Sequence, residues 1–184
     1  MAGRCDVIAA TAVNHPEITA AVEELKSKGI PVFSLLSDFA QGVRAGYIGL
    51  NNLKVGRTAA WMIAKAARKP GKVATFIGSH RFHGHELREV GFRSYMRECA
   101  PHLTVLDSVV NLETRQLTYE TTLGLLARQP TLRGIYVAGG GMEGAIAALR
   151  ESRPQTEVAV VVSALTGDSR AGLAEGLVTL VTDT

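Results

Sequence analysis

Long apolar runs, cysteine pairs and concentrated charge are all scarce in this sequence of 184 residues. No apolar run approaches the roughly 18 residues that a membrane-spanning helix needs. The two cysteines, Cys5 and Cys99, lie far apart without metal-ligand spacing, so we expect reduced or buried thiols, with a disulfide as the alternative. The first residues show no signal-peptide pattern. These absences predict a protein without a membrane partner, and a cytoplasmic location fits them best.

Charge of one sign is also in short supply. The net charge is +3, and the lysines and arginines are scattered. The densest group, Lys65, Arg68, Lys69 and Lys72, flanks a Pro-Gly turn. Surfaces that bind nucleic acids usually form a basic stripe beside a recognition element, and neither is evident here. We therefore expect this group to be a solvated surface, and we expect no specific DNA binding by this chain alone.

What the sequence does have is a regular alternation of strand and helix patterns. Hydrophobic residues make up 46% and charged residues 20% of the chain, as in ordinary globular proteins. Short runs rich in Val, Ile and Leu predict strands, and apolar residues at helical spacing predict helices between them. The expected strands cover residues 6–13, 30–36, 47–50, 72–78, 103–110, 134–138, 158–163 and 177–181. The expected helices cover residues 18–28, 52–67, 85–99, 113–128, 142–151 and 168–176.

This alternation predicts an α/β fold with parallel sheets covered by helices on both faces. The pattern starts again after Pro70-Gly71, which suggests two lobes joined there. We expect a first lobe over residues 1–70 and a second over residues 71–176. Ligands of such folds bind beyond the carboxyl ends of the strands, so we expect the site in the segments that follow the strands.

One of these segments matches a weak motif. Gly139 to Gly144 fits the G-x-G-x-x-G pattern of dinucleotide-binding loops, between a predicted strand and a predicted helix. No acidic residue ends the strand that follows, however, as that motif requires. We expect a tight turn in which Gly144 packs closely on the sheet, and no cofactor.

A histidine-rich segment could be either a metal site or a polar loop. His80, His83 and His85 lie close together beside Glu86, as in some metal sites. The spacing lacks the second histidine of H-E-x-x-H, so a polar loop that caps the following helix is the main expectation, and no metal is expected. No motif for a catalytic nucleophile is evident. Catalysis is therefore not expected, and an enzyme with a doubly wound fold is the lesser alternative.

The order of several short segments is more specific than any one motif. These segments are Gly29 to Val32, Tyr47 to Asn52, Gly71 to Ala74, Arg88 to Phe92, Leu132 to Ala138 and Gly144 to Leu149. In this order they resemble the ligand-binding core shared by transcription regulators of the lactose-repressor (LacI) type and periplasmic sugar-binding proteins. The resemblance covers essentially the whole chain.

The resemblance implies two doubly wound parallel-sheet lobes of the periplasmic-binding-protein-like type I, the first of them incomplete. Compared with that family, the chain would begin at the third strand of the first lobe, without the helix-turn-helix headpiece that contacts DNA. Residues 177–184 would begin the crossover back to the first lobe. An incomplete first sheet exposes an edge, so we expect lower stability than that of an intact domain, or pairing with another chain.

The resemblance also implies which residues contact a ligand held between the lobes. They are Thr11, Ser37, Asp38, Phe82, Glu86, Glu113, Gly139, Gly140, Leu165 and Asp183. Family members that bind sugars commonly have Arg in place of Glu86, Asn-Asp in place of Gly139-Gly140 and Asp near Leu165. Most of the groups that hydrogen-bond a sugar are therefore missing, and Phe82 is the one evident aromatic.

The carboxylates in this set raise a narrower hypothesis. If Asp38, Glu86 and Glu113 converge, they would favour a donor-rich or cationic ligand. The simpler alternative for Glu86 is an ion pair with Arg81 or with another base of the cleft.

The function that the resemblance implies is ligand sensing without catalysis. We expect the effector-binding domain of a LacI-type regulator, which binds a small effector, a sugar or a polyol, and controls DNA binding through the absent headpiece. A homodimer is expected with it. The alternative is a periplasmic solute-binding protein of a sugar ABC transporter.

Overall fold

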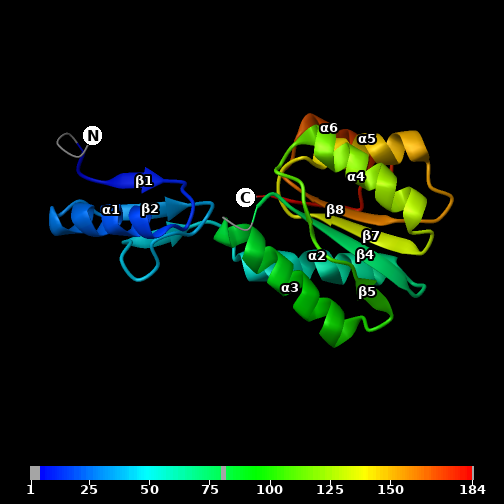
Figure 1. Cartoon of the computed structure of the whole chain (residues 1–184), viewed down its shortest axis with the longest axis horizontal. Helices are drawn as coiled ribbons and strands as arrows, with labels where there is room; N and C mark the ends of the chain where they lie inside the picture. The colour runs from blue at the N-terminus through cyan, green and yellow to red at the C-terminus, as the bar shows by residue number, and fades with distance from the viewer. Residues whose placement is uncertain (1–4, 80–81, 184) are drawn as a thin grey trace.

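The computed structural model describes residues 5–79 and 82–183, and their strands form two separate parallel sheets (Figure 1). The first sheet has the order β1-β2-β3, with β1 at Ile8–Ala10, β2 at Val32–Leu35 and β3 at Gly46–Ile48. The second has the order β5-β4-β7-β8-β9, and β6 also pairs with β4. Its strands are β4 (Gly71–Ile77), β5 (Leu103–Val105), β6 (Val109–Val110), β7 (Leu132–Val137), β8 (Ala159–Ser163) and β9 (Leu180–Thr182). The predicted α/β fold with parallel sheets is confirmed.

The helices connect the strands as the alternation predicted. They are α1 (Pro16–Ser27), α2 (Asn52–Ala66), α3 (His83–Cys99), α4 (Arg115–Arg128), α5 (Met142–Ser152) and α6 (Gly167–Ala174). The predicted strand over 103–110 is divided, because β5 and β6 pair separately with β4. Within the described residues, no helix is long and apolar enough to cross a membrane.

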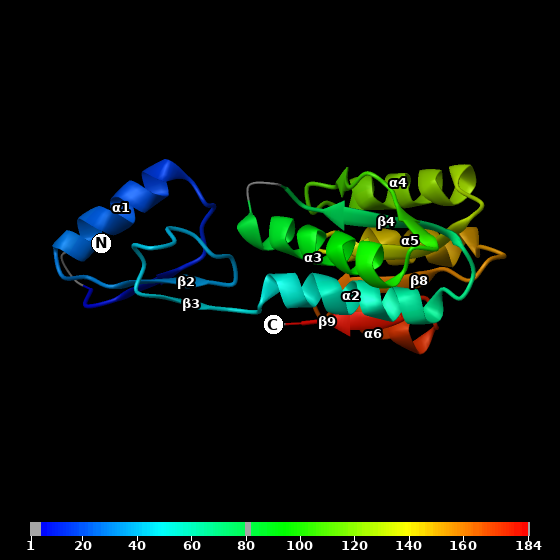
Figure 2. The ribbon, with the colours of Figure 1, turned by 90° about the horizontal axis from the view of Figure 1, so that it is seen from below.

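Strand alternation divides the core of the second sheet into two layers. Successive side chains of a strand point to opposite faces. Accordingly, Val73 and Ile77 pack with α2 and α3 on one face, while Ala74 and Phe76 pack with α4 and α5 on the other. All four side chains are fully buried. Helices therefore cover both faces of this sheet, as expected (Figure 2).

The first sheet has a smaller core and a single described helix. Helix α1 begins at Pro16, where a side-chain nitrogen of His15 accepts a hydrogen bond from the amide of Glu17 at 3.3 Å. It lies along one face of the sheet, and its Val22 packs against Val32. Prolines suit the first helical turn because their missing amide hydrogen is not needed there. Of the two faces of this sheet, the described helix covers only one, which differs from the expectation of helices on both.

Two glycines bring α2 and α3 into close contact. A Cβ atom on Gly56 would lie 1.9 Å from the carbonyl oxygen of Arg88, and one on Gly91 would lie 2.1 Å from that of Leu53. Only glycine permits such an approach. Helix α2 thus packs on the second sheet, although it precedes Pro70, and β9 also pairs within this sheet. Strand β9 lies within residues 177–184, which were expected to begin the crossover to the first lobe. The residue boundaries of the two lobes stay a prediction.

The glycine-rich turn after β7 is tight, but its contact differs from the expected one. Gly141 has a φ of 86°, a left-handed conformation that glycine adopts without strain. A Cβ atom on Gly144 would lie 2.1 Å from the carbonyl oxygen of Arg115. Gly144 therefore packs against the start of α4 rather than against the sheet.

Candidate functional site

A cavity of about 500 Å³ lies where the carboxyl ends of strands from both sheets meet. The first sheet and the start of α2 contribute Thr11, Leu36, Ser37, Leu50 and Asn52. The second sheet and its helices contribute Phe82, Gly84, His85, Arg88, Glu113, Gly139, Gly140, Met142, Glu143, Ser163, Ala164, Thr166, Thr182 and Asp183. The site is thus at the strand ends where parallel α/β sheets bind ligands.

His85 and Glu113 form a polar pair at one wall of this cavity. Nε2 of His85 lies 3.5 Å from Oε1 of Glu113, which also accepts a hydrogen bond from the amide of Gly140 at 3.2 Å. Burial lowers the pKa of His85, and the nearby carboxylate of Glu113 only partly opposes this effect. The imidazole is therefore neutral at neutral pH, so it can both donate and accept a hydrogen bond.

Glycines make room for this pair. A Cβ atom on Gly78 would lie 2.3 Å from Cγ of Glu113, and one on Gly139 would lie 2.8 Å from Cε1 of His85 and 2.9 Å from Oε1 of Glu113. The small residues after β4 and β7 thus let the acid and the histidine lie directly over the strand ends. The glycines at 139 and 140, which depart from the sugar-binding pattern, have a structural reason here.

A buried asparagine positions the loop that carries Glu113. Asn111 is fully buried; its Oδ1 accepts from the amide of Glu113 at 3.0 Å, and its Nδ2 donates to the carbonyl oxygen of Gly140 at 2.9 Å. Leu112 and Glu113 both have left-handed backbone conformations, with φ of 51° and 57°. Asn111 therefore holds the loops after β6 and β7 together and fixes the direction of Glu113.

Arg88 connects the walls of the cavity. Its Nε donates to Oδ1 of Asn52 at 2.7 Å, and its Nη1 donates to the carbonyl oxygen of Ala138 at 2.6 Å and to the hydroxyl of Ser163 at 3.3 Å. Three elements, α2, β7 and β8, are thus joined to α3 through one guanidinium. Within the described part of the chain, no carboxylate forms an ion pair with Arg88, so its charge faces neutral acceptors and the cavity.

Several hydroxyls of the cavity are already engaged as donors. Thr11 lies 3.1 Å from the carbonyl oxygen of Leu35, Ser163 lies 3.2 Å from that of Val137, and Thr182 lies 3.4 Å from that of Val162. A hydroxyl has one hydrogen, so each of these oxygens can only accept a hydrogen bond from a ligand. With Glu113 and Asp183, the cavity offers more acceptors than donors.

The cavity contains most of the residues that the resemblance implied. They are Thr11, Ser37, Phe82, Glu113, Gly139, Gly140 and Asp183. Whether these residues contact a ligand stays a prediction.

Three other implied residues do not line the cavity. Asp38 accepts two hydrogen bonds from Arg44, from Nε to Oδ1 and from Nη2 to Oδ2, the second at 2.8 Å. The Arg44 guanidinium lowers the pKa of Asp38 to about 2. Leu165 is exposed, and its amide donates to Asp183 at 3.0 Å.

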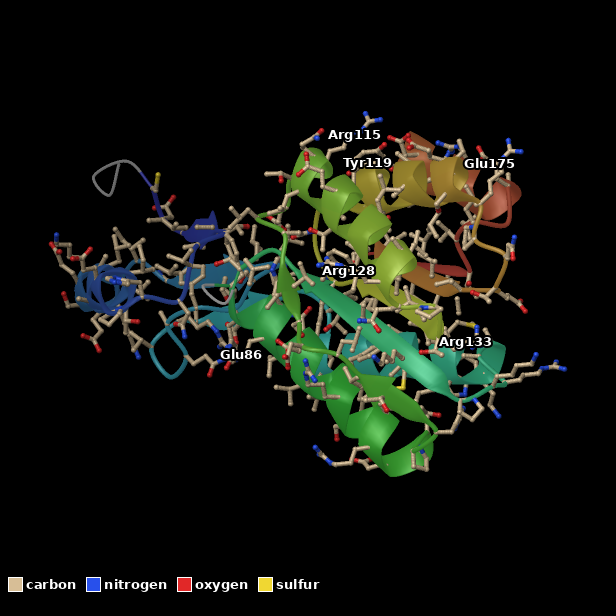
Figure 3. All side chains as sticks on the ribbon, turned by 45° about the vertical axis from the view of Figure 1, so that its right-hand side comes forward. Glu86, Arg115, Tyr119, Arg128, Arg133 and Glu175 are labelled. Carbon is tan, nitrogen blue, oxygen red and sulfur yellow. The ribbon has the colours of Figure 1, made fainter. Side chains whose placement is uncertain are left out.

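Glu86 is the third, so the three carboxylates do not converge. It lies in the first turn of α3, is exposed, and approaches Nδ1 of His83 at 3.3 Å (Figure 3). The alternative partner Arg81, like His80, lies outside the described residues. No group of three or more metal-ligating side chains occurs in residues 5–79 and 82–183.

Seven polar residues that line the cavity were not among the predicted contacts: Asn52, His85, Arg88, Glu143, Ser163, Thr166 and Thr182. Asn52 lies in a segment that follows a predicted strand, where the site was expected, but it was not named as a contact. Arg88 lies two residues beyond Glu86, and α3 carries it under the cavity. Its signal was a base in the first turns of the helix after β4. At 3.6 residues per turn, residues two apart point to nearly opposite sides of a helix, so Glu86 and Arg88 cannot both face the cavity.

Two sheets whose strand ends face one cavity define a two-lobed ligand-binding protein of the α/β class. The family profile described as the periplasmic binding protein domain matches residues 1–183. The chain belongs to this family. A comparison with curated protein sequences gives no match.

Solved structures agree with this fold. An ABC transporter solute-binding protein from Burkholderia graminis, in complex with D-arabinose, is 23% identical, with a TM-score of 0.88 over 96% of this chain and 62% of that one. One from Agrobacterium vitis, bound with α-D-tagatopyranose, is 23% identical, with a TM-score of 0.84 over 96% and 63%. The protein XylFII is 20% identical, with a TM-score of 0.86 over 96% and 65%. The chain thus spans less than two thirds of the length of these proteins.

Proposed function

We propose that this chain binds a small polyhydroxylated molecule, a monosaccharide or a polyol, in the cavity between its two sheets, as the binding unit of a solute-binding protein. The observation that carries the proposal is the cavity itself, which strand ends of both sheets enclose. Its volume of about 500 Å³ suits a small ligand. The solved relatives with D-arabinose and α-D-tagatopyranose support this ligand class.

The arrangement of donors and acceptors also favours a hydroxylated ligand. The carboxylate of Glu113 accepts hydrogen bonds. The hydroxyl oxygens of Thr11 and Thr182 also accept, because their hydrogens are donated to backbone carbonyl oxygens. Sugar hydroxyls can donate to all of these acceptors. Arg88 and His85 provide N–H donors for the oxygen atoms of the ligand. Phe82 provides an apolar surface for the carbon skeleton. The ligand is held by polar groups at several points, which fixes its orientation.

Binding between the sheets implies a conformational response. A ligand that contacts Thr11 on one side and Glu113 on the other stabilises a closed arrangement, because only that arrangement makes both sets of contacts. The chain therefore signals occupancy by closure and does not alter its ligand chemically.

The second candidate is the effector-binding domain of a LacI-type regulator. The sequence pattern from Tyr136 to Leu149 favours it. In that case closure would move a homodimer and its helix-turn-helix headpieces on DNA, inside the cytoplasm. The two candidates share the cavity and differ in what is attached to it. The native gene upstream of Met1 separates them, because a signal peptide indicates the solute-binding protein and a helix-turn-helix indicates the regulator.

Calorimetric titration of the 184-residue chain tests the ligand class. The titrants are D-arabinose, D-fucose, D-tagatose, D-glucose, D-galactose and myo-inositol, with an amino acid and a dicarboxylate as controls. We expect heat from at least one sugar or polyol, and none after Arg88→Ala, which removes the guanidinium between the walls. Binding of only the control titrants would overturn the proposal.

A further inference from the structure

A second cavity, of about 550 Å³, lies at the other end of the second lobe. Basic residues line it: Lys65, Arg68, Lys69 and Arg133. Arg133 is the second residue of β7, whereas the ligand cavity lies beyond the last residue of that strand, so about 15–20 Å separates the two sites along the strand. Figure 3 shows Arg133 at the end of the sheet away from Glu86 and the first lobe. Three of the four residues in the basic group that the sequence suggested to be a solvated surface, Lys65, Arg68 and Lys69, thus border a cavity.

The side chain of Arg133 is closely packed, but its Nε donor has no hydrogen-bond partner among the described residues. A Cβ atom on Gly71 would lie 2.5 Å from Cγ of Arg133, so the side chain crosses the start of β4 in a space that only glycine leaves open. Its Nε atom is buried. A buried donor without an acceptor costs free energy, so this side chain is held in place by the packing around it and not by a partner in the described part of the fold.

The positive charge of this cavity is not neutralised by acidic side chains among the described residues of its lining. Glu157 is the one acidic side chain of its described lining. None of the ion pairs found in the described ranges includes Lys65, Arg68, Lys69 or Arg133. Four cations therefore face one carboxylate in a concave site. Such a site concentrates anions from solution.

The end of α2 accounts for only part of this charge. The C-terminus of a helix carries a partial charge of about −0.5, which nearby cations stabilise. Lys65 lies in the last turn of α2 and suffices for that. The carbonyl oxygen of Ala67 additionally lies 3.3 Å from Nε2 of His102. Arg68, Lys69 and Arg133 exceed what this helix end needs.

We propose that this basic cavity is a second binding site, separate from the ligand cavity, and that it takes a phosphate group. The guanidinium of Arg133 presents parallel N–H donors that match two phosphate oxygens, and the lysines add point charges around them. The hydroxyl of Thr156, which also lines the cavity, adds a neutral donor. The phosphate belongs either to a soluble phosphorylated molecule or to the headgroup of a phospholipid.

The test uses the full chain at physiological ionic strength with two probes. Pyrophosphate is titrated by calorimetry, and co-sedimentation is measured with phosphatidylcholine vesicles that contain or lack phosphatidylglycerol. Binding of pyrophosphate alone identifies a soluble ligand, and binding to the anionic vesicles alone identifies a headgroup; either result supports the site. Binding of neither probe overturns it.

Matched variants decide whether the binding is specific. Arg133→Gln is expected to weaken binding of the active probe about tenfold or more, because it removes charged hydrogen bonds. Lys69→Gln, at an exposed position, tests the same cavity without disturbing packing, and a loss of about threefold or more is expected. Arg170→Gln removes an equal charge from the exposed face of α6 and should leave affinity within about twofold. Equal losses in all three variants would show nonspecific attraction and overturn the proposal.

Discussion

The imidazole of His85 and the carboxylate of Glu113 meet at 3.5 Å although they come from different strand ends, one after β4 and the other after β6. The pair lies over glycines and beside the amide of Gly140. This relationship places a charged acceptor and a neutral donor–acceptor group at one wall of the cavity. It gives the first prediction.

Glu113→Gln is expected to weaken ligand binding about 10- to 100-fold, because a hydrogen bond to a charged acceptor contributes about 1.5–3 kcal/mol. The amide side chain keeps the shape of the carboxylate, so the melting temperature should change little. Calorimetry with the best sugar or polyol measures the loss. Glu23→Gln, on the exposed face of α1, is the matched control. If Glu113→Gln and Glu23→Gln bound the ligand equally well, the proposed role of Glu113 in binding would be contradicted.

Gly139→Ala is expected to weaken binding and to destabilise the fold by about 1–3 kcal/mol, since its new methyl group would overlap both His85 and Glu113. Gly167→Ala is the control, because nothing lies within 4 Å of a Cβ atom there. Urea unfolding and calorimetry together measure both effects. If both alanine variants behaved alike, the close packing around residue 139 would be contradicted.

The ion pair between Asp38 and Arg44 predicts a pH dependence of stability. The pKa of Asp38 in the fold is about 2, below its ordinary value of 3.8, so its stabilising effect is complete above about pH 4 and is lost as the pH falls toward 2. Asp38→Asn should cost about 1–2 kcal/mol at pH 7 and much less near pH 2. Urea unfolding at several pH values, followed by circular dichroism, provides the comparison. A constant difference between wild type and variant would refute this role.

The two sheets should also differ in local stability. Four buried hydrophobic residues form the core of the first sheet, whereas each face of the second has twelve or more. Regions with few buried apolar contacts open at lower free energy. Hydrogen exchange followed by mass spectrometry should therefore show amides of β2 exchanging about 100-fold faster than those of β7. Similar protection of the two strands would contradict this expectation.

Local patterns were enough to predict the fold. Runs such as Lys72 to Gly78 combine β-branched residues with a following helix signal, and the parallel sheet follows from their alternation with helices. The packing of α2 was not predictable in this way. It depends on Gly56 of α2 and Gly91 of α3, where the two helices touch. These glycines are 35 residues apart in the sequence, and no hydrophobic periodicity marks them. The split of β5 from β6 likewise depends on pairing with β4.

The candidate site was predictable only in part, for a physical reason. Residues that directly follow a strand, such as Thr11 and Ser37, could be placed at the cavity from the strand pattern. The direction of a side chain on the first turns of α3 could not. Glu86 and Arg88 are two residues apart, and the helix turns the first outward and the second under the strand ends.

The left-handed backbone at Leu112 and Glu113 has a consequence for how this protein tolerates change. Each such residue without glycine's freedom costs on the order of 1 kcal/mol, so glycine or asparagine at position 113 would relieve the turn. The same replacement would remove the carboxylate that the turn displays. On the proposed function, in which Glu113 contacts the ligand, selection for heat resistance alone would therefore favour variants that are more stable and bind the ligand less well.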